Sequence, residues 1–214
     1  MEHLSVLVVD DHPVFADAMQ MRLSAEPDLL PVRAAYSAIQ ARRLLASQRF
    51  DVVVLDFLLD DELGTKLIKD AKQSANPPAV LVLSGSRDLD VIVEAVLEGA
   101  DGWIAKTANL AHLIDAVRGV HAGEIWLEPA LLGKVLPRLM SQLSGHDRGP
   151  IDQLTARERE VLDLMAQGLT RAEIGERLQM AHNTVRTHTH NLIRKLGAHS
   201  ALEAVAIALR SAPD

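Results

Sequence analysis

Short apolar runs alternate with longer amphipathic stretches through the first 120 residues of the chain. The short runs have strand length, and several are unbroken runs of Val and Leu, which is typical of strands buried on both faces. The stretches between them place apolar residues three and four positions apart, as amphipathic helices do. Five strands alternating with five helices predict a parallel sheet covered by helices on both faces. The expected strands are Leu4–Val9, Leu30–Ala35, Val52–Leu55, Val80–Leu83 and Gly102–Ala105.

The alternation stops near residue 120, and only helical patterns follow. Pro129–Leu143 is expected to form one connecting helix. The polar segment 144–150 is rich in Gly and Pro and is expected to be a linker. The chain is therefore predicted to hold an α/β domain at 1–120, a linker with a connecting helix at 121–150, and a small four-helix domain at 151–214.

Two helices of this second part have the spacing of a helix-turn-helix. Thr170 is a suitable N-cap, and Glu173 three residues later completes a capping box for a helix over 170–178. After a short break, a second helix over 183–196 ends at Gly197. Its apolar side holds Val185, Leu192, Ile193 and Leu196. Its polar side holds Thr184, Arg186, Thr187, His188, His190, Asn191, Arg194 and Lys195.

Composition narrows the class of protein. The chain has 214 residues, a formal net charge of −7 and no cysteine, so disulfides, thiolate metal sites and a cysteine nucleophile are excluded. No apolar window is long enough for a membrane span, and acidic residues directly follow the N-terminal apolar run, unlike a signal peptide. We therefore expect a cytoplasmic protein that has no membrane partner.

Charge is distributed unevenly along the chain. Residues 1–120 hold 18 acidic and 11 basic residues, whereas residues 181–202 hold no acidic residue at all. A solvated face on an ordinary helical bundle is the simplest interpretation of such a basic stretch. The absence of acids over twenty-two residues, in a chain that holds 29 of them, instead favours a surface for nucleic acid.

Five polar residues stand where the predicted strands end: Asp10, Asp11, Asp56, Ser84 and Lys106. Ligands of open parallel sheets bind beyond the carboxyl ends of the strands, so these side chains are expected to converge. Three carboxylates in one place repel one another, and Mg²⁺ suits such a set. The lysine and the serine would neutralise and hydrogen-bond a phosphoryl group. The pattern indicates attack of a carboxylate on phosphorus, which gives an acyl phosphate.

The segments VLVVDDHPVF, VVVLDFLLDDELG, VLVLSGS and GADGWIAK resemble the receiver domain of two-component response regulators, which has a flavodoxin-like (βα)5 fold. The resemblance implies that Asp56 is the phosphoacceptor. It also implies that Asp11, Asp56 and the backbone carbonyl of Leu58 hold Mg²⁺, with Asp10 acting nearby, largely through water.

The same resemblance assigns the remaining receiver residues. Lys106 would contact the phosphoryl group, Ser84 would swing toward it, and Trp103 would be the switch aromatic. Two positions depart from the family pattern. Asp60, followed by Asp61 and Glu62, replaces the usual proline after the phosphoacceptor, and Trp103 replaces the commoner Tyr or Phe. Neither change removes a catalytic group, so phosphorylation is expected.

Residues 150–209 are similar to LuxR-type output domains, from LTAREREVL through NTVRTHTHNLIRKLG to LEAVAIA. The resemblance implies that Arg186, Thr187 and His190 face the bases. It places Thr170, His188, Arg194 and Lys195 near phosphates or in helix packing. It makes the last helix, with Leu202, Val205 and Leu209, the dimerisation helix. His190 and Ala201 replace a Lys and an Arg that are common in the family, which is expected to weaken non-specific affinity for DNA.

Together the halves resemble a NarL/FixJ-type response regulator: a transcription regulator phosphorylated by a sensor histidine kinase or a small phosphodonor. It would bind double-stranded DNA and form a homodimer on DNA or on phosphorylation. One alternative is an aspartyl phosphatase on a similar sheet, but such enzymes place Asp-x-Asp directly after the first strand. A second alternative is a DNA-binding protein whose receiver no longer accepts phosphate. The intact set of five polar residues argues against that interpretation.

Overall fold

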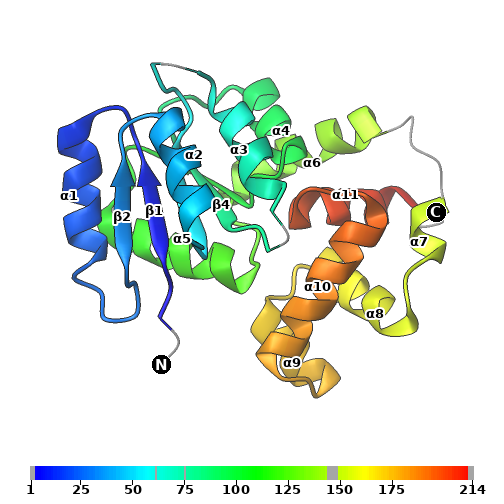
Figure 1. The fold of residues 1–214 in the computed structure, drawn as a ribbon. Coiled ribbons are helices and arrows are strands. Elements are labelled where there is room, and N and C mark those ends of the chain that lie inside the picture. Colours follow the sequence, from blue (N-terminus) through cyan, green and yellow to red (C-terminus); the bar gives the residue numbers. More distant parts are fainter. Residues whose placement is uncertain (1–2, 61, 75, 144–148, 212–214) are drawn as a thin grey trace.

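The first domain is a five-stranded parallel sheet with strand order β2-β1-β3-β4-β5. Its strands β1 and β2 lie side by side in Figure 1. The structure is a computed structural model that describes residues 3–60, 62–74, 76–143 and 149–211. The order is that of flavodoxin-like folds, and all five predicted strands are confirmed with ends shifted by at most two residues. They are β1 (Val6–Val9), β2 (Val32–Ala35), β3 (Val52–Asp56), β4 (Ala79–Ser84) and β5 (Gly102–Ala105).

Helices cover both faces of the sheet. Alternate residues of each strand point to opposite sides, so the apolar strands present an apolar surface on each face that helices bury. Val6 and Val8 of β1 pack in one apolar cluster with α1 (Pro13–Leu23) and α5 (Leu110–Ala122). Leu7 and Val9 pack in another. The helices on that second face are α2 (Ala38–Ser47), α3 (Gly64–Lys72) and α4 (Leu89–Leu97).

The segment that follows α5 lies along the open edge of the sheet. Trp103 N donates to the carbonyl of Trp126 at 2.8 Å, and Gly102 pairs with Trp126 as an isolated parallel bridge. The first part of the linker therefore extends the sheet beside β5 through Trp126. The hydrophobic pattern of the sequence did not indicate this contact.

The regular elements in the described part of the chain after this segment are helices, as predicted. The predicted connecting helix is α6 (Pro129–Gln142), and the short α7 (Gly149–Asp152) was not expected. Residues 144–148 of the predicted linker, and Asp61 of the acidic loop, lie outside the described residues. The other helices of the second domain are α8 (Ala156–Ala166), α9 (Arg171–Leu178), α10 (His182–Leu196) and α11 (Ala201–Ser211).

Capping residues set the ends of these helices. Thr155 begins α8 and Thr170 begins α9, each in a complete capping box that satisfies backbone N–H groups at the helix start. Gly197 ends α10 in the left-handed conformation, with φ of 66°, which glycine adopts without a Cβ clash. The predicted Thr170–Glu173 box and the predicted Gly197 stop are thus confirmed.

The two domains pack against each other through α6. Val135 and Leu139 of α6 are fully buried, and they belong to the same apolar cluster as the α2–α4 face of the sheet and the second domain. α6 contacts both α4 and α11 (Figure 1). No helix among the described residues combines the length and the apolar character needed to cross a membrane.

Candidate functional site

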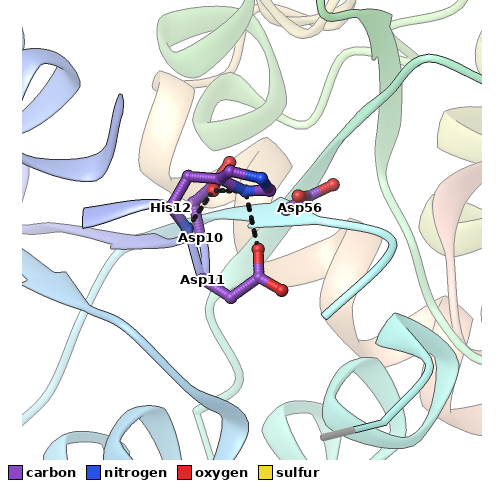
Figure 2. Close-up of side chains that lie close together, drawn as sticks. All are labelled: Asp10, Asp11, His12 and Asp56. Carbon is purple, nitrogen blue, oxygen red and sulfur yellow. Dashed lines mark hydrogen bonds and ion pairs between the residues drawn. The ribbon is translucent and has the colours of Figure 1, made fainter. Parts of the chain in front are cut away.

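Three carboxylates meet at the carboxyl edge of the sheet. Asp10 and Asp11 follow β1 and Asp56 ends β3, and these strands are neighbours in which Val9 pairs with Leu55. Asp10 and Asp56 are only 1% and 3% exposed. One ligand atom from each of these three residues and from His12 lies within 4.8 Å of the others (Figure 2). The predicted convergence of the acidic residues is thus present in the structure.

Lys106 supplies the positive charge at this cluster. Its Nζ lies 2.5 Å from Asp56 Oδ2 and 3.2 Å from Asp10 Oδ2, and it stands 5.4 Å from the centre of the Phe15 ring. Burial raises the pKa of the Asp56 carboxyl, and the Lys106 ammonium only partly opposes this effect. Burial disfavours the charged lysine as well, but its bonds to Asp56 and Asp10 outweigh that and raise the pKa of Lys106.

His12 completes the cluster, although no motif in the sequence singled it out as a site residue. Its Nδ1 lies 3.1 Å from Asp10 Oδ1 and 2.8 Å from Asp11 Oδ1 (Figure 2). The hydrogen bond to Asp10 and the negative charges of both aspartates raise the pKa of His12. Its position directly after the Asp10-Asp11 pair was the only signal available in the sequence.

Only one of the two carboxylate oxygens of Asp11 accepts a hydrogen bond of good geometry among the described residues. Its Oδ2 accepts a 2.7 Å hydrogen bond from the backbone N–H of Asp60. Its Oδ1 is buried and, although His12 Nδ1 lies 2.8 Å away, it accepts no hydrogen bond of good geometry among the described residues. Proline has no N–H, so the departure from the family pattern at residue 60 adds a bond that proline would not allow. A buried carboxylate oxygen that lacks a hydrogen bond of good geometry, in a set of hard oxygen ligands, fits a divalent cation such as Mg²⁺.

Ser84, Leu58 and Trp103 lie around this cluster. Ser84 ends β4 beside Asp56, and its Oγ accepts a 3.0 Å bond from Ser86 N. Leu58 N donates to Asp56 Oδ1 at 3.3 Å. The Trp103 ring is 4% exposed and stands 5.4 Å from the Phe57 ring. It also lines a cavity of about 780 Å³ that extends to the second domain, so there is space beside the ring.

The helix-turn-helix is formed by α9 and α10. Val185, Leu192 and Leu196 are buried, as predicted for the apolar side of the second helix. Thr184, Arg186, Thr187, His190 and Arg194 are exposed, while His188 is partly buried. The polar side of α10 is therefore a continuous surface with basic groups and no acidic side chain of its own.

Lys195 lies in the helix packing of the second domain, one of the two placements that the family resemblance allowed for it. Its Nζ lies 2.7 Å from Oε2 of Glu158, a buried residue of the α8 capping box. Burial alone would raise the pKa of Glu158, but its bonds to Lys195 and Thr155 outweigh burial and lower it. The ammonium group is thus part of an ion pair inside the second domain, as the helix-packing alternative implied.

The residues expected to mediate dimerisation are mostly covered in this arrangement. Leu202 and Val205 are 3% and 5% exposed, while Leu209 is 37% exposed. Their helix, α11, packs on α8, α6 and α10. A dimer formed through Leu202 and Val205 would require α11 to separate from α6.

Two family models match the two domains. Residues 6–118 match the response regulator receiver domain, and residues 152–208 match the luxR family of bacterial regulatory proteins. The chain is 33% identical over 208 residues to the transcriptional regulatory protein LiaR of Bacillus subtilis, covering 97% of this chain and 98% of the relative. It is 31% identical to the DNA-binding transcriptional activator DevR/DosR of Mycobacterium tuberculosis, covering 96% and 94%. The chain therefore belongs to the response regulators that join a receiver to a luxR-type DNA-binding domain.

Solved structures agree with this assignment. The signal receiver domain of a NarL response regulator from Mycobacterium tuberculosis matches with a TM-score of 0.55 and 25% identity, covering 58% of this chain and 100% of that one. The RcsB–DNA complex matches 99% of this chain and 100% of its own with a TM-score of 0.54, and at 19% identity it supports the fold alone. The protein is a two-component response regulator and a DNA-binding transcription regulator. Because this family is not one of conventional enzymes, the phosphatase interpretation is excluded.

Proposed function

We propose that Asp56 accepts a phosphoryl group and that its phosphorylation controls DNA binding by the second domain. The observation that carries the proposal is the placement of Lys106 Nζ between Asp56 and Asp10 in a buried acidic cluster. A carboxylate oxygen of Asp56 attacks phosphorus and forms a P–O bond while the bond to the donor breaks. With a phosphohistidine of a sensor kinase, the imidazole leaves with the electron pair and later takes a proton from water.

The residues around Asp56 have separate tasks in this step. Asp11, Asp56 and the Leu58 carbonyl would hold Mg²⁺, with Asp10 acting nearby, largely through water. When bound, the ion would supply positive charge that offsets the repulsion between these carboxylates and the incoming phosphoryl group. Lys106 leaves its bond to Asp56 and pairs with a phosphoryl oxygen. Ser84 exchanges its bond to Ser86 N for a bond that its hydroxyl donates to the same group.

DNA recognition is assigned to α10, which enters the major groove. Arg186, Thr187 and His190 read bases, being closest to the N-terminal part of the helix on its exposed side. The backbone contacts come from Thr170, Thr184, His188 and Arg194. Phosphorylation changes the β4–α4–β5 region around Trp103 and frees α11 from α6 for a homodimer. A coupling of about 1–3 kcal/mol between the two sites changes DNA occupancy substantially.

Phosphotransfer tests this proposal directly. The full chain is incubated with labelled acetyl phosphate and Mg²⁺, and covalent label is measured for the parent and for Asp56→Asn, whose amide is not a nucleophile. Asp17→Asn, an exposed aspartate of α1, is the matched control. Label should appear on the parent and on the control and be absent from Asp56→Asn. Equal labelling of all three would contradict the assignment of Asp56, and no labelling of the parent would favour a receiver that no longer accepts phosphate.

A further inference from the structure

Arg171 links the DNA-binding domain to the receiver. It is the first residue of α9, directly after the Thr170 N-cap, and only 8% of it is exposed. Its Nη1 donates a 3.2 Å hydrogen bond to the backbone carbonyl of His121, near the end of α5 in the receiver. The structure gives this guanidinium no ion pair with a carboxylate among the described residues. A group with five N–H donors is thus held in the interface mainly through one carbonyl.

A glycine of the receiver makes room for this side chain. Gly123 is the C-cap of α5 and has a left-handed backbone with φ of 79°. A Cβ added at Gly123 would lie 1.5 Å from Arg171 Nη2 and 2.2 Å from its Cζ. The guanidinium therefore fills a notch that exists only because residue 123 has no side chain.

The electrostatic surroundings of Arg171 are unfavourable for a cation. Burial, followed by repulsion from Arg186, lowers the pKa of Arg171 to about 10. Asp101 of the receiver and Glu124, two residues after the end of α5, attract it, but neither forms an ion pair with it. A buried charge that lacks a contacting counter-charge is costly. The repulsion from Arg186 also shows that Arg171 is close to the surface we assign to base reading.

We propose that Arg171 binds a DNA backbone phosphate, and that the His121 carbonyl and the Gly123 notch hold the same side chain when the domains are docked. The inference rests on the proposed function in that its ligand is duplex DNA. In a helix-turn-helix the first helix crosses the DNA backbone, and Arg171 begins that helix. A phosphate offers the planar guanidinium two charged acceptors in place of one carbonyl. Domain docking and DNA binding then compete for one arginine.

The test separates the two uses of Arg171 in the full-length, unphosphorylated chain. Gly123→Asn places a side chain where the guanidinium lies, and asparagine tolerates the left-handed backbone better than most residues. Gly123→Ala is the second variant, and circular dichroism and thermal unfolding check that both fold. Affinity for a random-sequence DNA duplex is measured by fluorescence anisotropy over a range of salt concentrations. Both variants should bind the duplex several-fold more tightly than the parent, because the arginine is released.

Arg171→Gln is then added to Gly123→Asn. Loss of one phosphate contact should reduce the slope of log K against log salt by about 0.9. Arg177→Gln is the matched control, because Arg177 is exposed, lies on the same helix and carries the same charge. Its six-residue separation places it on another side of α9, so it should change the slope much less.

Three outcomes would overturn the inference or its basis. An unchanged slope in the Arg171 variant, while Arg186→Ala still weakens binding, would make Arg171 a domain contact only. Unchanged affinity in both Gly123 variants would contradict the competition between docking and DNA. If Arg186→Ala also left DNA affinity unchanged, the proposed DNA interface itself would be wrong. Failure of the Arg171 proposal is thus distinguishable from failure of the proposed function.

Discussion

Lys106 Nζ lies 2.5 Å from Asp56 Oδ2, and it is the only lysine or arginine ion-paired with the acidic cluster among the described residues. The same ammonium is 3.2 Å from Asp10 Oδ2. It therefore offsets the repulsion between two buried carboxylates. A group that stabilises the unphosphorylated site is also the group assigned to the phosphoryl oxygen.

Replacing Lys106 by methionine should destabilise the metal-free chain. The variant leaves Asp10 and Asp56 buried without their ammonium partner, at a cost of about 1–3 kcal/mol. Mg²⁺ should restore more stability to the variant than to the parent, because more negative charge remains to bind it. Urea unfolding is followed in EDTA and in excess Mg²⁺. Lys134→Met, at an exposed position of α6, is the control. Equal Mg²⁺ effects on all three chains would show that Lys106 does not balance this cluster.

Trp103 should report phosphorylation by its fluorescence. The ring starts buried against Phe57 beside a cavity, so movement toward solvent would shift its emission to longer wavelength. Trp126→Phe isolates the signal, since these are the only two tryptophans, and it keeps the backbone carbonyl that accepts from Trp103 N. Emission is recorded as Mg²⁺ and fluoroberyllate are added. Emission that stays constant at saturation would mean that the ring does not move.

Arg186 should determine base preference. Its side chain is exposed on the N-terminal half of α10, where a recognition helix contacts base edges. Arg186→Ala should cost about 1–3 kcal/mol of binding free energy and relax the preference at one base pair of the operator. Selection of binding sequences from a random pool, for parent and variant, measures both quantities. If the variant selected the same sequences with the same affinity, Arg186 would not be a base-reading residue.

Arg194 and Lys195 are neighbours with equal charge but should behave differently. Arg194 is exposed, so Arg194→Gln should reduce the salt slope of DNA binding by about one unit without lowering stability. Lys195→Met should mainly lower the free energy of unfolding, by about 1–2 kcal/mol, because it leaves Glu158 buried and unpaired.

The pH dependence of unfolding tests the ion pair between Lys195 and Glu158. The pKa of Glu158 is lower in the folded chain than its ordinary value of 4.5. Its stabilising contribution is therefore complete above pH 4.5 and is lost as the pH falls through the lower, folded value. The stability difference between parent and Lys195→Met should be largest near neutral pH and shrink in acid. A difference that does not depend on pH would contradict the ion pair.

His190 should make DNA binding dependent on pH. Partial desolvation of the otherwise exposed ring, followed by the charges of Arg194, Arg186 and Lys72, lowers the pKa of His190 from its ordinary value of 6.5. The negative potential of DNA and the acceptor atoms of the bases favour the cation, so binding takes up a proton and tightens as pH falls from about 7.5 to about 6. His190→Gln should remove this trend, whereas His188→Gln should keep it. Equal trends in the parent and in His190→Gln would assign the proton to another group.

The sequence by itself determined the elements and the chemistry of this protein. Unbroken Val and Leu runs specify strands buried on both faces, and the Thr170–Glu173 pair specifies a helix start, because both signals are local. The convergence of Asp10, Asp11, Asp56 and Lys106 also followed from the sequence, since parallel strands bring their carboxyl ends to one edge. Family resemblance then assigned roles to positions that periodicity alone leaves equivalent.

Only the tertiary structure decided which partner each charged side chain takes. Lys195 pairs with Glu158, which is 37 residues away in the chain, and Arg171 bonds to His121, which is 50 away. A periodic pattern of residues cannot predict pairings over such sequence separations, because they depend on how separate helices pack. The covering of Leu202 and Val205 was hidden for the same reason: an apolar helix face shows that a partner exists, and the packing of α6 against it shows which one.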